Sequence, residues 1–113
     1  MALVYELPVY KASYDLLMEV FETVKHFKRE YKYTVGEKLK DETLEMLMNI
    51  YRANIRREKK ETLQKAREHL EVVRLLMRLT KDMKQINISR FVKVNQKIET
   101  ISKQLTGWQK ASN

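Results

Sequence analysis

The residues best placed to do chemistry are cations that recur every seven positions, at Lys60, Arg67, Arg74 and Lys81. On a helix this spacing keeps them, together with Arg78, within a stripe about 60° wide that extends for about 30 Å at about 1.5 Å per residue. Arginine holds phosphate oxygens through two hydrogen bonds and also stacks on bases, so its excess over lysine here favours a nucleic acid. We therefore expect the stripe to bind a polyanion.

Further cations extend this stripe toward one end of the molecule, at Arg52, Arg56 and Arg57. The chain carries 23 Lys and Arg against 15 Asp and Glu, a formal charge of +8. Residues 60–113 hold 12 of these cations and 5 of the acids, a net charge of +7. Such a surplus suits a nucleic acid, an acidic protein or a membrane surface, and solubility alone is the competing explanation.

The arginines of the stripe also have a purely structural explanation. Arg67, Arg74 and Arg78 can pair with Glu68 and Glu71 or with acids of a neighbouring subunit. Any nucleic-acid binding should be directed at the phosphate backbone and sensitive to salt, because no segment reads as a base-recognition element.

The elements that position these residues are predicted to be helical. The chain of 113 residues has two Gly and one Pro, and apolar residues recur at three- and four-residue intervals. We predict an all-α protein, a single domain over residues 1–113 folded as an antiparallel up-down-up-down four-helix bundle. The four helices are expected at residues 8–31, 34–56, 60–86 and 88–109.

Local signals mark several helix ends. Pro8 suits a first turn, and Thr34 with Glu37 has the capping-box spacing. Asn87 or Ser89 can cap the last helix, which we expect to continue through Gly107 despite a cost of about 1 kcal/mol.

The third predicted helix has an apolar surface too wide for a monomer. Leu70, Val73 and Met77 form one side, and the other side brings the apolar arc to roughly 200°, whereas a bundle needs little more than 100°. We therefore predict that the second side packs against another subunit. The predicted interface consists of Val72, Leu75, Leu76, Leu79 and Met83, with Trp108 at the end of the last helix.

Catalytic, metal and membrane signals are absent from the sequence. There is no Cys, and His26 and His69 stand alone without a spacing that would ligate zinc or a di-iron centre. No phosphate-binding loop or nucleophile motif occurs. We expect no enzyme activity, no cofactor and no metal. No segment reaches 18 uncharged apolar residues and no signal peptide is recognised, which indicates a cytoplasmic protein without a membrane partner.

Four segments resemble a known family: Tyr33 to Leu39, Tyr51 to Asn54, Arg74 to Leu79 and Leu105 to Trp108. They read YTVGEKL, YRAN, RLLMRL and LTGW. The chain is similar over nearly its whole length to the small four-helix-bundle proteins first noted in intervening sequences of large-subunit ribosomal RNA genes. Within that group it most resembles the accessory variability determinant proteins of diversity-generating retroelements.

This resemblance implies a homopentameric barrel of four-helix bundles whose basic surface engages RNA or DNA and a partner reverse transcriptase. The matching basic positions are Arg74 and Arg78, with Arg52 and Arg56 as further candidates. The sequence thus favours a non-catalytic, oligomeric nucleic-acid-binding accessory protein. The alternative is an oligomeric scaffold that docks an acidic protein without binding nucleic acid.

Overall fold

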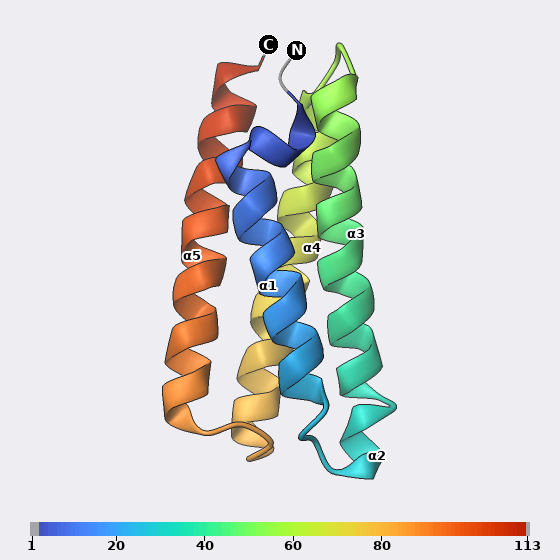
Figure 1. The fold of residues 1–113 in the computed structure, drawn as a ribbon, viewed down its shortest axis with the longest axis vertical. Coiled ribbons are helices and arrows are strands. Elements are labelled where there is room, and N and C mark those ends of the chain that lie inside the picture. The colour runs from blue at the N-terminus through green and yellow to red at the C-terminus, as the bar shows by residue number, and fades with distance from the viewer. Residues whose placement is uncertain (1–2, 113) are drawn as a thin grey trace.

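The structure is a computed structural model that describes residues 3–112, and within this range the chain forms helices and connecting turns without a strand (Figure 1). The all-α class is therefore confirmed. The elements, in chain order, are η1 Val4–Glu6, α1 Pro8–Val24, α2 Arg29–Lys32, α3 Val35–Ile55, α4 Lys60–Asp82 and α5 Ile88–Ala111.

The four long helices lie side by side in an elongated molecule of 43 × 23 × 21 Å (Figure 1). The α3–α4 connection lies at the same end as η1 and the C-terminal end of α5, and we call this end the tip. The α1–α3 and α4–α5 connections lie at the other end, the base. Helix α1 packs against α3 and α5, and α4 packs against the same two helices, so α1 and α4 are diagonal to each other.

One apolar core runs between the four helices, because each helix turns a stripe of apolar side chains inward. Leu70, Val73 and Met77 are buried in it, as the sequence predicts. The largest fully buried side chains include Leu16 and Val20 of α1, Leu39, Met46 and Ile50 of α3, Leu63 of α4, and Ile98, Ile101 and Leu105 of α5.

The first helix is shorter than expected, since α1 ends at Val24 and not near residue 31. The amides of His26 and Phe27 bond to the carbonyls of Thr23 and Val24 at 3.2 and 3.1 Å, which tightens the chain into a turn. This turn buries the Phe27 ring against the core at 4% exposure. Phe27 fits the apolar spacing of α1, and the sequence therefore predicted a longer helix. In the structure Phe27 packs into the core from the turn that follows α1.

Helix α4 also ends early, at Asp82 and not at residue 86. Lys84 adopts a left-handed backbone with φ of 60°. The amide of Gln85 bonds to Thr80 O and the amide of Lys84 to Lys81 O, both at 2.9 Å, which is the Schellman arrangement of a helix C-terminus. The sequence did not predict this helix end, because a lysine, Lys84, occupies the left-handed position that glycine usually takes.

The helix starts agree with the sequence in part. Asn87 caps α5, where its side-chain oxygen accepts from the Arg90 amide at 2.8 Å, and α5 passes through Gly107 to Ala111 as predicted. The capping box at Thr34 is wrong. The Thr34 hydroxyl donates to Glu30 O at 2.7 Å, because α2 directly precedes α3 and offers a free carbonyl.

Polar contacts also link neighbouring helices. His69 Nδ1 lies 2.7 Å from a carboxylate oxygen of Glu42, which joins α4 to α3. Glu19 of α1 binds Arg90 at 2.9 Å and Lys93 at 3.1 Å on α5. These pairs use several of the chain's cations for holding the bundle together.

Candidate nucleic-acid interface

The predicted basic stripe lies along the contact between α4 and α5. Arg67 Nη1 donates to Gln109 Oε1 of α5 at 2.5 Å. Lys81 Nζ lies 4.9 Å from the centre of the Phe91 ring of α5, a cation–π contact, and 3.8 Å from the Asp82 carboxylate. The cations of the stripe therefore lie along one side of α4, as the spacing predicts, but Arg67 and Lys81 on that side contact α5.

Arg74 is neutralised by two carboxylates of its own chain. Its guanidinium donates to both oxygens of Glu71 at 3.2 Å and forms an ion pair with Glu99 of α5. The Arg74 side chain is 30% exposed, and those of Glu71 and Glu99 are 60% and 48% exposed. The expected pairing of Arg74 with Glu71 is thus present, and a phosphate must compete with these acids for Arg74.

Arg78 is the exposed arginine of the stripe, and within residues 3–112 it forms no ion pair. It lines a groove of about 460 Å³ between α4 and α5, whose other lining residues are Glu71, Arg74, Leu75, Phe91 and Asn95. The groove combines cations with an aromatic ring and an amide, a combination that can receive an anion or a base.

The tip carries the other predicted cations. Arg56 Nη1 donates to Thr62 Oγ1 at 3.0 Å. Exposed Arg57 and Lys60, and half-buried Arg52, form no ion pair in the part of the chain that the structure describes. Lys59 is used internally, because its ammonium donates to the carbonyls of Ala53, Asn54 and Arg56 at 2.6–3.3 Å and so caps α3. The tip therefore presents several uncompensated cations.

A second basic cluster lies at the base and was missed by the sequence reasoning. Lys28 and Arg29 follow the turn after α1, and Lys84 lies in the α4–α5 connection. The two segments are joined because the Lys28 amide donates to Gln85 Oε1 at 2.9 Å. These three cations are exposed and form no ion pair within the described residues.

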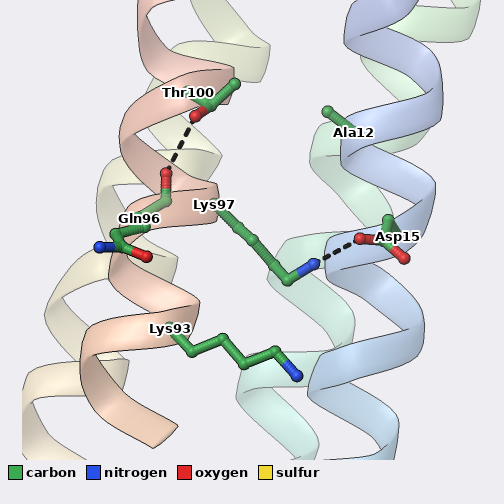
Figure 2. A pocket seen from close by; sticks show the side chains of 6 residues that line it. All are labelled: Ala12, Asp15, Lys93, Gln96, Lys97 and Thr100. Atoms are coloured by element: carbon green, nitrogen blue, oxygen red, sulfur yellow. Dashed lines mark hydrogen bonds and ion pairs between the residues drawn. The ribbon is translucent and has the colours of Figure 1, made fainter. Parts of the chain in front are cut away.

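The groove between α1 and α5 shows a different use of lysines (Figure 2). It has a volume of about 330 Å³ and is lined by Ala12, Asp15, Lys93, Gln96, Lys97 and Thr100. Lys97 Nζ lies 2.5 Å from Asp15 across the groove, and Lys93 extends toward α1, where it pairs with Glu19. Acids of α1 therefore compensate the lysines of α5 on this side.

The predicted interface residues of α4 differ in exposure. Leu75, Leu79 and Met83 are 65%, 38% and 36% exposed. Val72 is half-buried, and Leu76 and Trp108 pack partly against the core of their own chain. The apolar surface of α4 available to a partner is therefore narrower than the arc counted on the sequence, and its role as an interface stays a prediction.

A larger apolar surface lies across α1 and α3 and was not assigned by the sequence reasoning. We call it the apolar face, and its members are 38–58% exposed: Tyr14, Met18 and Phe21 of α1 with Leu44, Met48 and Ile55 of α3. Lys40 Nζ of α3 lies 5.2 Å from the centre of the Phe21 ring. The packing of α1 on α3 brings the two stripes together.

Tyrosines continue this surface toward the tip. The ring of Tyr10 lies 5.6 Å from that of Tyr5 and 6.1 Å from that of Tyr14, measured between centres. Burial raises the pKa of Tyr10, and the neighbouring phenols of Tyr5, Tyr14 and Tyr51 raise it further. Tyr51 belongs to α3, so this interaction also joins the two helices.

Other site types find no support within residues 3–112. The structure brings together no group of His, Asp and Glu side chains suited to holding a metal ion, and it contains no helix that could cross a bilayer.

Comparison with known protein families identifies the family of this chain. Residues 8–112 match the family described as bAvd-like, meaning accessory variability determinant-like. The match includes all four long helices and both basic ends. No curated protein matches the chain.

Proposed function

This chain belongs to the bAvd-like family, and we propose on that basis that it is a non-catalytic accessory protein of a diversity-generating retroelement. In this proposal the antiparallel bundle assembles as a homo-oligomer, a pentameric barrel, through the exposed apolar residues of α4. Its cations bind the phosphate backbone of RNA or DNA and support a partner reverse transcriptase.

The observation that carries nucleic-acid binding is the uncompensated charge at the tip and along α4. Arg52, Arg57, Lys60 and Arg78 form no ion pair within the described residues. Since a cation without a protein partner can release counterions from phosphates on binding, these four provide the main attraction. Arg56, Arg67, Arg74 and Lys81 already have protein contacts and supply a smaller share.

A non-catalytic role agrees with how the polar groups are arranged. The closest acid–base pairs, such as Glu42 with His69 and Asp15 with Lys97, join neighbouring helices and serve the fold. The groove between α1 and α5 is open, and its lysines Lys93 and Lys97 are ion-paired, whereas general acid–base catalysis needs groups that converge on a sheltered substrate.

The test is a salt titration of RNA and DNA affinity for two matched double variants. Arg57→Ala with Arg78→Ala removes two exposed cations from the proposed surface. Lys11→Ala with Lys38→Ala removes the same charge from α1 and α3. We expect the first variant alone to lose about two units of slope in a plot of log affinity against log salt, because each phosphate contact contributes about one.

Two results would contradict this proposal. A wild-type protein that binds neither RNA nor DNA near physiological salt removes nucleic-acid binding altogether. An equal loss of salt slope in the two double variants would contradict the assignment of the binding surface to α4 and the tip, since net charge alone would then explain the affinity.

One observation favours the alternative function, docking of an acidic protein. Arg74 is already held by two protein carboxylates, so the contact between α4 and α5 accepts acidic side chains. A partner captured by the wild-type protein after complete nuclease digestion, and lost on Arg78→Ala, would support this alternative over nucleic-acid binding.

A further inference from the structure

The apolar face is large enough to be an interface. Its six side chains have areas of about 200 Å² each and are roughly half exposed, so together they present on the order of 600 Å². A standard interface buries about 800 Å² on each partner, and the largest apolar patch of a typical monomer is about 300–600 Å². Tyr5 and Tyr51, at 62% and 45% exposure, extend the surface further.

The same chain carries a second, unlike apolar surface, the α4 patch, which consists of Leu75, Leu79 and Met83. Leu75 and Leu79 follow one line of α4, and Met83, the residue directly after its last turn, continues this line at the same four-residue interval. Because α4 is diagonal to α1, this line lies on a different side of the bundle from the apolar face. The apolar face spans two helices and the α4 patch only one, so the two surfaces differ in width.

The two sides of the bundle also differ in net charge. Helices α1 and α3 carry four cations and seven acids, a net charge of −3. Helices α4 and α5 carry eleven cations and five acids, a net charge of +6. Two apolar faces meeting each other would bring two negative sides together, whereas an apolar face meeting the α4 patch joins sides of opposite charge.

From these observations we propose that the apolar face of one copy of this chain receives the α4 patch of a second copy, head to tail. The inference rests on the oligomeric part of the proposed function and names the surface that completes it. Because the two surfaces are unlike, a pair of copies keeps one apolar face and one α4 patch free after the first contact, so further copies add until the ring of the proposed function closes.

This arrangement leaves the basic residues of the tip accessible. Arg67, Arg74 and Lys81 follow the line of α4 that contacts α5, whereas the α4 patch follows another line. Leu75 belongs to the α4 patch and also lines the groove beside Arg74 and Arg78, so docking there covers that edge of the groove. The exposed cations of the tip, Arg57 and Lys60, lie outside the α4 patch and stay accessible to a nucleic acid.

The experiment uses two full-length double variants that each damage one surface. The first is Met18→Glu with Leu44→Glu, on the apolar face, and the second is Leu75→Glu with Leu79→Glu, on the α4 patch. Ile88→Glu with Val92→Glu is the matched control, since both residues are exposed on α5 and belong to neither surface. Native mass spectrometry gives the mass, and circular dichroism checks that each variant is folded.

We expect the wild type and the control to form the same oligomer and each of the other variants to remain a 13.6 kDa monomer. Mixing these two variants should restore one contact, between the intact α4 patch of the first and the intact apolar face of the second. The mixture should therefore form a complex with one chain of each, which cannot grow further.

Different results overturn different statements. A wild-type monomer overturns the oligomeric part of the proposed function together with this inference. An apolar-face variant that assembles like the wild type overturns the inference alone, as does a mixture that stays monomeric. If either glutamate variant is unfolded, the milder serine substitutions at the same positions are measured against the same outcomes.

Discussion

The α1/α3 side and the α4/α5 side of the bundle differ in both charge and apolarity. The first has a net charge of −3 and exposes the six residues of the apolar face. The second has a net charge of +6, and the apolar residues that its two helices expose are Leu75, Leu79, Ile88 and Val92. Both sides surround the same core and contribute to it equally well.

This difference is more than folding requires. The core needs one apolar stripe on each helix, and all four long helices supply one that is completely buried. Exposed apolar area and unbalanced charge add nothing to that burial, and large apolar patches mark interaction sites. The difference between the two sides fits the proposal that one side serves contact between copies and the other binds an anion.

The largest expected effect tests how tightly the α1/α3 side is packed at the base. A Cβ on Gly36 of α3 would lie 2.7 Å from Val24 Cγ1 and 3.2 Å from Tyr31 O. We predict that Gly36→Ala destabilises the protein by about 1–3 kcal/mol, because both contacts are too close and the surroundings are buried. Thermal unfolding should show a midpoint lower by roughly 5–15 °C. An unchanged midpoint would mean that the contact between α1 and α3 is loose.

A smaller effect tests whether the cations of α4 are limited by their own acids. Glu71→Gln with Glu99→Gln should release Arg74 from both of its carboxylate partners. We predict a few-fold higher RNA affinity and a salt slope steeper by about one unit. Stability should change little, since exposed ion pairs contribute about 0–1 kcal/mol each.

The control for this prediction makes the same change of net charge on the other side. Asp41→Asn with Glu45→Gln removes two acids from α3, which form no ion pair within the described residues. An equal gain in affinity for both variants would show that total charge matters and that Arg74 does not.

Much of this fold could be predicted from the sequence because the apolar period of the long helices is regular. The errors at residues 25–31 and 83–86 have physical causes that act across the fold. Phe27 is pulled into the core from a turn, and Lys84 accepts a left-handed backbone that the bonds to Thr80 and Lys81 stabilise. Neither effect leaves a pattern in the local sequence.

The sequence predicted which cations share one side of α4, but it did not predict their contacts with the neighbouring helix. Seven-residue spacing placed Arg67, Arg74 and Lys81 correctly on one line of α4. It could not reveal that Glu99 and Gln109 of α5 face that line, because a helix period does not identify the neighbouring helix. The apolar face could not be predicted for the same reason, since its two halves belong to separate helices, α1 and α3.

The smallest expected effect uses the second glycine, which lies on the α4/α5 side. A Cβ on Gly107 of α5 would meet nothing within 4 Å, in contrast to Gly36. We predict that Gly107→Ala stabilises the protein by about 0.5–1 kcal/mol, because alanine loses less backbone freedom in a helix than glycine does. The midpoint of thermal unfolding should rise by a few degrees. A lower midpoint would show that α5 is packed against a second chain at Gly107, which would move the contact between copies to the α5 side.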